Sequence, residues 1–168
     1  MESLRAEGIV DNVGVAGGPV DLLARYINTD IFDVVLTHNR YSLLDRSADW
    51  LLDLAAHRGM GVVNAAPYGG GMLARGPQDQ PKYAYGQGGE ATPGRAFAMQ
   101  LACREYAVPL AAAALQFSIR DKRISSTVVG VSSPDRIDQT LDLLRHPIPE
   151  ALWDNLQKLT PPSDEWLG

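Results

Sequence analysis

The sequence predicts an α/β fold made of four parallel βα units, half the number found in a closed (β/α)8 barrel. Short apolar segments alternate with segments whose apolar residues recur at helical spacing. The short segments are apolar on both faces, as expected for strands covered by helices on one side and by a packed interior on the other. The 168 residues suit a single domain over 1–168 but fall short of the ~250 residues of a typical complete barrel.

The first two units occupy the first third of the chain. The apolar residues at 8–15 predict a strand, and after a Gly-rich turn the pattern at 20–27 predicts a helix. A β-branched run at 32–37 predicts the second strand. Ser47 is the expected N-cap of the next helix, which Gly59 should end.

The last two units are separated by a long irregular stretch. Strands are expected at 61–65 and 126–131. Helical spacing predicts four helices, at 94–106, 109–119, 134–144 and 148–159. Four strands in one open sheet leave two unpaired edges, which attract further strands. We therefore expect a homodimer or a complementary N-terminal half that completes the barrel.

The irregular stretch at 69–92 is too rich in glycine for regular structure and is long for a loop in a compact domain. Loops of this length are functional lids or disordered segments. Tyr83 and Tyr85 are its aromatic residues. Two interpretations stay open: a lid that lays a tyrosine over a ligand, or a mobile insertion.

Composition narrows the function classes. The formal net charge is −5 and basic residues do not cluster, which argues against binding to nucleic acid or to an anionic membrane surface. No apolar stretch approaches the ~20 residues of a membrane span. We expect a soluble, cytoplasmic protein. Cys103, the single cysteine, has apolar neighbours typical of a helix interior, so we interpret it as a core thiol.

Ligands of parallel βα folds bind at the carboxyl ends of the strands, so residues directly after each strand are the candidates. His38 follows the second strand and could act as an acid, a base or a hydrogen-bond donor. At the last junction, Ser133 is a good N-cap, Pro134 a good first helical residue, and Arg136 falls in the first turn. This arrangement predicts an anion site that would suit a nucleotide phosphate, or simply an ordinary capped helix.

Other catalytic patterns are missing at the predicted strand ends. His57 and His146 fall at helix ends without metal-ligand spacing, so no metal site is expected. The sequence has no Gly-x-Ser-x-Gly motif, no phosphate-binding Gly-Lys-Ser or Gly-Lys-Thr and no paired carboxylates after a strand. These absences argue against acyl transfer, NTP hydrolysis and glycoside hydrolysis.

Several of these segments resemble the C-terminal half of the aldo-keto reductase family, nearest its sugar dehydrogenase branch with L-fucose and D-threo-aldose dehydrogenases. The resemblance covers nearly the whole chain and would make its four strands the fifth to eighth of a TIM barrel. The matching segments are LRAEG at 4–8 with VGV at 13–15, FDVVLTHNRYSLLD at 32–45, GMGVV at 59–63 with Pro67, and PLAAAALQF at 109–117 continuing to VVGVSSP at 128–134.

The resemblance implies an oxidoreductase that binds NADP or NAD and transfers hydride to or from an aldehyde, ketone or sugar. Tyr68, Gly69 and Gly71 match the segment that holds the pyrophosphate. His38 stands where the family usually has a glutamine near the nicotinamide. The residues that match the family's adenosine and 2'-phosphate contacts are Val131, Ser132, Ser133, Arg136 and Gln139.

The sequence also departs from the family pattern. Ala16 and Gly17 replace the usual Ser-Asn pair that holds the carboxamide, Ala65 replaces the tyrosine that stacks on the nicotinamide, and Thr140 replaces an asparagine beside the adenine. The family's catalytic Asp, Tyr, Lys and His belong to its first four βα units and have no counterpart here. The chain by itself is therefore expected not to run the family reaction by its usual mechanism.

Two alternatives remain beside an NAD(P)-dependent half-barrel. The strand ends could serve cofactor-independent hydrolysis of a small amide, lactam or ester, with His38 as general base and Tyr41 or Tyr68 as proton donor. The chain could also be an inactive truncated fragment. These three residues are the catalytic candidates, and the substrate in either active case is a small molecule.

Overall fold

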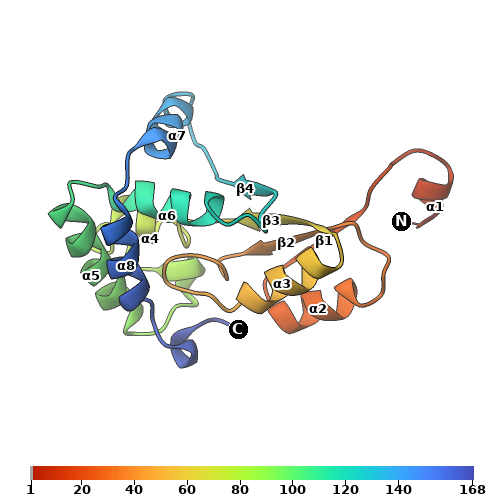
Figure 1. Cartoon of the computed structure of the whole chain (residues 1–168), viewed down its shortest axis with the longest axis horizontal. Coiled ribbons are helices and arrows are strands. Elements are labelled where there is room, and N and C mark those ends of the chain that lie inside the picture. Colours follow the sequence, from red (N-terminus) through yellow and green to blue (C-terminus); the bar gives the residue numbers. More distant parts are fainter. Residues whose placement is uncertain (1) are drawn as a thin grey trace.

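The computed structural model describes residues 2–168 and confirms the predicted α/β fold. Its four strands are β1 (Gly14–Gly17), β2 (Val34–His38), β3 (Gly61–Ala65) and β4 (Ser126–Val128). They form one parallel sheet in the order β1-β2-β3-β4, so each strand pairs with its neighbour in the sequence (Figure 1). The bounds of β3 are those expected from the sequence.

Two of the strands are shorter than their apolar patterns indicate. The chain at 8–12 is a turn that follows α1 (Glu2–Ala6), and pairing with β2 begins only at Gly14. β4 ends at Val128 because its partner β3 ends at Ala65, after which the backbone turns away at Ala66 with φ +57°. The apolar residues beyond Val128 therefore have no adjacent strand.

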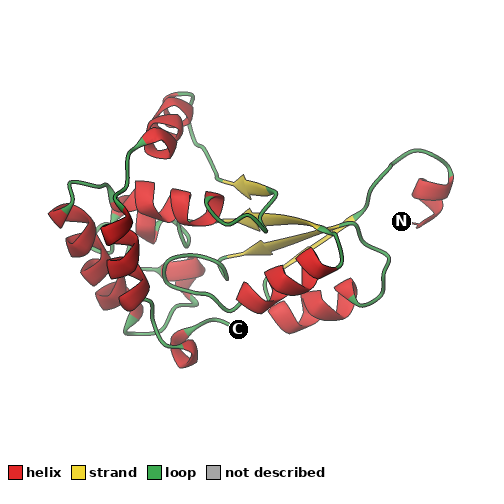
Figure 2. Cartoon of the chain, in the orientation of Figure 1, coloured by secondary structure: helices red, strands yellow, loops and turns green. Residues whose placement is uncertain are grey.

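The helices follow the predicted order, with bounds shifted by at most two residues (Figure 2). They are α2 (Val20–Ile27), α3 (Asp49–His57), α5 (Thr92–Glu105), α6 (Leu110–Ile119), α7 (Asp135–Arg145) and α8 (Glu150–Lys158). The prediction that Ser47 caps α3 is wrong, because its hydroxyl donates to Asp45 Oδ1 at 2.6 Å and Ala48 takes the N-cap position. No helix in the described part of the chain is long and apolar enough to cross a membrane.

The two faces of the sheet differ in burial. Along β2 and β3, buried and partly exposed residues alternate, with Val35 and Val62 inside the core. Leu36 and Val63 lie on the other, partly exposed face, and Val128 of the edge strand is 47% exposed. The core thus forms between one sheet face and the helices, while the described residues leave the opposite face incompletely covered. The expected partner that would cover it remains a prediction.

Helix α7 stands away from the rest of the molecule (Figure 1). None of its residues is buried, and the Gln116 side chain of α6 holds its C-terminal end by donating to the Leu143 and His146 carbonyl oxygens. Ile137 and Leu141, one helical turn apart, are exposed. Cys103 is fully buried in the core, as expected, and burial raises its pKa to about 11, so the thiol is unreactive near neutral pH.

Candidate functional site

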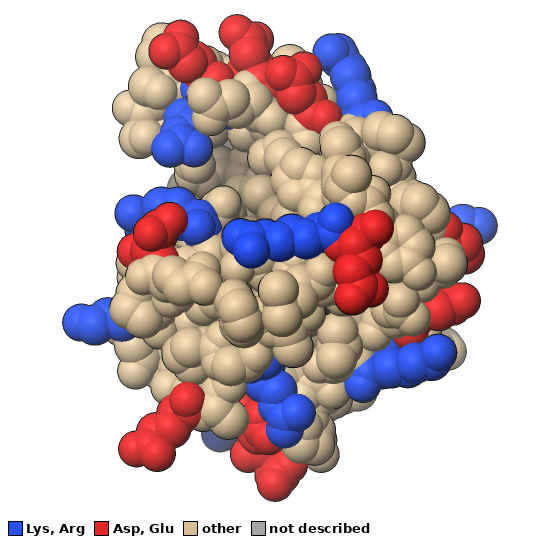
Figure 3. Space-filling model, turned by 90° about the vertical axis from the view of Figure 1, so that its left-hand side faces the viewer, with Lys and Arg blue, Asp and Glu red and all other residues tan. Residues whose placement is uncertain are grey.

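A cleft of about 490 Å³ opens after the carboxyl ends of β3 and β4. Figure 3 looks at this end of the molecule and shows a hollow below the uppermost part, where α7 stands in Figure 1, with Lys and Arg side chains around it. Five of the predicted cofactor-binding residues line the cleft. The full lining is Ala66, Tyr68, Gly70, Gly71, Ala74, Arg75, Tyr85, Gly130, Val131, Ser132 and Arg136.

Gly70 and Gly71 of the lining belong to a turn of three consecutive left-handed glycines, at 69–71, with φ of +57°, +71° and +99°. Only glycine adopts such angles without strain. Gly69, which was also predicted to bind the cofactor, does not line the cleft. A Cβ on Gly70 would lie 3.2 Å from the backbone nitrogens of Ala84 and Tyr85, so the turn lies close against the later part of the Gly-rich loop. The missing side chains give a ligand access to the backbone of this turn.

The Gly-rich loop is held to the fold by Tyr83. This side chain is 3% exposed, its hydroxyl donates to the Asn39 carbonyl oxygen at 3.0 Å, and it lies 2.7 Å from Ser42 Oγ. Tyr85 instead is 78% exposed and lines the cleft. Of the two tyrosines, only Tyr85 is therefore placed to contact a ligand.

The loop also contains regular structure that its glycine content did not predict. A short helix, α4 (Met72–Arg75), follows the glycine turn, and a 3-10 turn covers Tyr83–Gly86. Met72 and Leu73 are fully buried. The expectation of a wholly irregular segment is wrong because these apolar side chains enter the core.

The junction between β4 and α7 brings Val131, Ser132 and Arg136 to the cleft. The predicted capping is wrong in detail: Pro134 occupies the N-cap position of α7, and Ser133 contributes its carbonyl oxygen, which accepts from Arg136 N at 3.1 Å. Pro134 already adopts a helical backbone conformation, as expected for a first helical residue, although α7 itself begins at Asp135. Ser133 and Gln139, both predicted to bind the cofactor, are exposed but do not line the cleft.

Tyr68 is the catalytic candidate that the structure places in the cleft. Its hydroxyl is buried and has no hydrogen-bond partner in the described part of the chain. A buried hydroxyl without a partner is costly, and a ligand in the cleft would reach this one only after the side chain moved. Burial raises the pKa of Tyr68, which keeps the phenol protonated as a donor.

His38 ends β2 and does not line the cleft. Its Nδ1 lies 3.3 Å from Asn39 Nδ2. Burial, followed by the positive charge of Arg40, lowers the pKa of His38, which favours the neutral imidazole at neutral pH. Within residues 2–168 no hydroxyl or thiol is hydrogen-bonded to this imidazole, and the role of His38 as a general base for hydrolysis stays a prediction.

The hydroxyl of Tyr41 is hydrogen-bonded within a network of charged side chains. Its hydroxyl donates to Asp121 Oδ2 at 2.5 Å and accepts from Arg123 Nη2 at 3.2 Å. Its ring stacks on Phe117 with the centroids 5.0 Å apart. Burial and then the hydrogen bond to Asp121 raise the pKa of Tyr41. The expected role of Tyr41 as a proton donor to a ligand conflicts with this geometry, because the hydroxyl proton is already donated to Asp121.

Replacing Arg123 with glutamine is expected to shift acid unfolding to higher pH. Burial alone would raise the pKa of Asp121, but the hydrogen bonds from Arg123 and Tyr41 outweigh it and lower that pKa from 3.8 to about 2. A lowered carboxyl pKa stabilises the fold above pH 3.8, and this stabilisation is lost as the pH falls toward 2. Without Arg123 the pKa of Asp121 rises, so the loss begins at higher pH. Far-UV circular dichroism against pH measures the midpoint.

The matched control is Arg58→Gln, which breaks the ion pair of Arg58 with an exposed carboxylate, Asp30, at the molecular surface. Surface pairs of this kind contribute little to stability. An acid midpoint that moved equally in both variants would contradict a specific role for the Arg123 network.

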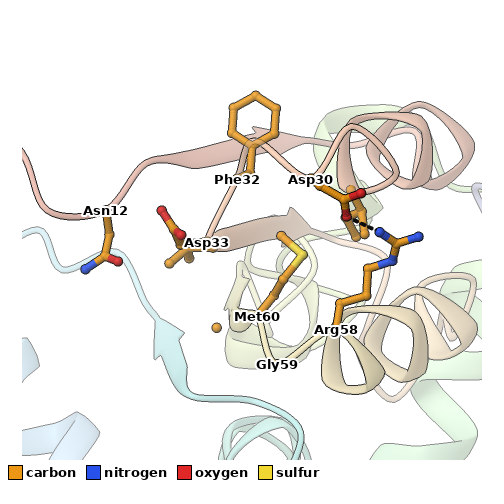
Figure 4. Close-up of a pocket in the computed structure, with 10 residues that line it drawn as sticks. Asn12, Asp30, Phe32, Asp33, Arg58, Gly59 and Met60 are labelled. Atoms are coloured by element: carbon orange, nitrogen blue, oxygen red, sulfur yellow. Dashed lines mark hydrogen bonds and ion pairs between the residues drawn. The ribbon is translucent and has the colours of Figure 1, made fainter. Parts of the chain in front are cut away.

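A second cavity, of about 530 Å³, lies at the amino ends of β2 and β3 (Figure 4). The two carboxylates that line this cavity are each paired with an arginine of the same chain. Asp33 accepts from Arg5 and from the Val13 amide, and Asp30 pairs with Arg58. In parallel βα barrels the amino-terminal face serves stability. We therefore assign the functional site to the cleft at the opposite ends of the strands.

The sequence analysis did not identify Arg75 as a lining residue of the cleft, whereas it named Tyr85 as one of two tyrosines that could cover a ligand. Arg75 lies four residues after a cofactor-binding candidate, Gly71, and a basic residue so close to a glycine turn was an available signal. The position of Arg75 in the sequence predicts a place in the cleft only if α4 is known to fold against the turn. An irregular loop would not direct the side chain there.

Comparison with known proteins agrees with this geometry. The family model described as "Aldo/keto reductase family" matches residues 1–161. The chain is 33% identical over 158 residues to a D-threo-aldose 1-dehydrogenase from a Pseudomonas species, covering 93% of this chain and 48% of the relative. It is 34% identical over 158 residues to a pyridoxal 4-dehydrogenase from Microbacterium luteolum, covering 94% and 46%.

Among solved structures, the holo form of the aldo-keto reductase AKR11C1 from Bacillus halodurans superposes with a TM-score of 0.73 at 22% identity. The superposition covers 95% of this chain and 54% of that structure, and it establishes the shared fold. The chain thus spans about half the length of the relatives it matches. The match to the family model over nearly the whole chain shows that this protein belongs to the aldo/keto reductase family.

Proposed function

We propose that the chain forms the cofactor-binding half of an NAD(P)-dependent oxidoreductase acting on an aldehyde, ketone or sugar. The observation that carries the proposal is the cleft itself. Residues from the glycine turn and from the start of α7, far apart in the sequence, meet there at the ends of parallel strands. This is where ligands bind in such folds.

The residues of the cleft fit a dinucleotide. The glycine turn lets phosphate oxygens approach the backbone, and Arg136 offers a guanidinium for a charged bond to phosphate. Tyr68 adds part of its side chain to the lining, although its hydroxyl is buried. When bound, a nicotinamide dinucleotide supplies hydride transfer, and the chain's own residues bind and orient it.

The proton needed for carbonyl reduction requires a further donor. In the described residues, the hydroxyl of Tyr41 is bonded to Asp121, that of Tyr83 is buried against Asn39 and Ser42, and that of Tyr68 is shielded from solvent. We propose that four further βα units cover the exposed sheet face and bring the proton donor. A second copy of this chain or a complementary half can supply such units, and molecular mass distinguishes the two.

The test is an isothermal titration with NADPH, with the molecular mass followed by light scattering. We expect binding in the wild type and a Kd raised about 10- to 100-fold in Arg136→Ala, since a hydrogen bond to a charged group contributes about 1.5–3 kcal/mol. The same substitution should weaken the binding of NADH less, because NADH lacks the 2'-phosphate. A doubled mass supports a second copy, whereas binding by the monomer favours a separate half.

Arg145→Ala is the matched control, because Arg145 is an exposed arginine in the last turn of the same helix and does not line the cleft. It should bind NADPH as the wild type does. Wild-type protein that took up neither NADPH nor NADH at millimolar concentration would contradict the proposed function.

A further inference from the structure

A second arginine reaches the cleft from a different element. Arg75 is the last residue of α4 and lines the same cleft as Arg136 of α7. Its guanidinium lies against the glycine turn, because a Cβ added to Gly71 would be 3.2 Å from Arg75 Nη2 and 3.6 Å from Nε. The absence of a side chain at Gly71 is therefore what leaves room for the guanidinium at this point.

The guanidinium of Arg75 makes no hydrogen bond or ion pair with residues 2–168. Five other arginines of the chain are each paired with a carboxylate: Arg5, Arg58, Arg95, Arg120 and Arg123. The residues that line the cleft include Arg75 and Arg136 but neither Asp nor Glu. The lining of the cleft thus carries two cations from separate elements, with Asp135 and Asp138 outside the lining in the first turn of α7.

Two cations on separate elements suit a ligand with two separate anionic groups better than one with a single phosphate. Guanidinium groups bind phosphate oxygens through paired, charge-assisted hydrogen bonds. Arg75 lies beside the glycine turn, where backbone groups are also accessible, whereas Arg136 lies at the start of α7.

We infer that Arg75 is a second phosphate-binding residue, which binds the pyrophosphate of a dinucleotide while Arg136 binds its 2'-phosphate. This inference rests on the proposed function for the identity of the ligand. It assigns to Arg75 a contact common to NADPH and NADH, and to Arg136 a contact specific to NADPH.

The test compares Arg75→Ala and Arg136→Ala in titrations with NADPH, NADH and inorganic pyrophosphate. We expect Arg75→Ala to weaken NADPH and NADH binding by a similar factor, about 10-fold or more, and to weaken pyrophosphate binding as well. Arg136→Ala should weaken NADPH binding more than NADH binding. Arg75 is exposed, so its substitution should leave the thermal unfolding midpoint unchanged.

Arg104→Ala is the matched control. Arg104 and Arg75 both line a neighbouring cavity of about 240 Å³, but only Arg75 also lines the cleft. The inference would be overturned if Arg104→Ala lost as much affinity for the dinucleotides as Arg75→Ala, or if Arg75→Ala bound them like the wild type. Either result would leave the proposed function standing. Pyrophosphate binding that depends on Arg75 without dinucleotide binding would support the phosphate contact and contradict the proposed function. Wild-type protein that bound none of the three ligands would overturn both.

Discussion

Replacing Gly69 with alanine is expected to lower the free energy of unfolding by about 2–4 kcal/mol, the sum of backbone strain and overpacking. Gly69 has a φ of +57°, which an L side chain adopts at a cost. The added Cβ would lie 2.0 Å from Cε2 and 2.4 Å from Cδ2 of Tyr83. Tyr83 is buried and hydrogen-bonded, so its ring cannot move aside without breaking those bonds.

Urea unfolding measures this change, with Gly89→Ala as the matched control. Gly89 lies in the same loop, has no atom within 4 Å of an added Cβ and has no positive φ. We expect Gly89→Ala to leave stability within about 0.5 kcal/mol of the wild type, as is usual for surface substitutions. Equal stability of the two variants would show that Gly69 and Tyr83 are not in contact in solution.

Replacing Tyr83 with alanine is expected to lower the free energy of unfolding by about 3–5 kcal/mol, the range for truncating a buried aromatic side chain. Tyr83→Phe keeps the ring but removes the hydroxyl that contacts Asn39 and Ser42. The phenylalanine variant should cost about 1–3 kcal/mol, because the carbonyl oxygen of Asn39 is left without this buried partner. Chemical unfolding of both variants separates the contribution of the ring from that of the hydroxyl.

A double-mutant cycle tests the contact itself. In a Tyr83→Ala background the clash disappears, and Gly69→Ala should then cost only the strain of the left-handed backbone, about 1–2 kcal/mol. Full additivity of the two changes would contradict the packing described here. The same variants should bind NADPH more weakly than the wild type, because the turn that Tyr83 supports carries Gly70 and Gly71, which line the cleft.

The order of the elements and much of the cleft could be predicted from the sequence. The bounds of β3 follow from its apolar run, since a central strand pairs on both sides and its length matches its hydrophobic pattern. Tyr68, Ser132 and Arg136 were predicted because they follow strands, whereas Gly71 and Val131 were expected only from the family resemblance. Parallel strands carry such residues to the same edge of a sheet, so sequence order already implies their proximity.

Other features depended on partners distant in the sequence. The ends of β1 and β4 are set by where β2 and β3 offer hydrogen bonds, not by the apolar residues at 9–10 and 129–131. Tyr41 and Tyr83 are equally plausible ligand contacts by sequence. In the structure the hydroxyl of Tyr41 is hydrogen-bonded to Asp121, and that of Tyr83 is hydrogen-bonded to Asn39 and Ser42.

The sequence by itself therefore determined the α/β class, the four parallel units and the location of the cleft, because local apolar periodicity and strand order specify these. Tertiary structure alone decided which polar groups remain available there. Arg75 and Tyr68 reach the cleft without protein partners, whereas Tyr41 does not reach it. The physical reason is that a polar side chain becomes available to a ligand only when no nearby group satisfies it, and those neighbours come from segments far along the chain.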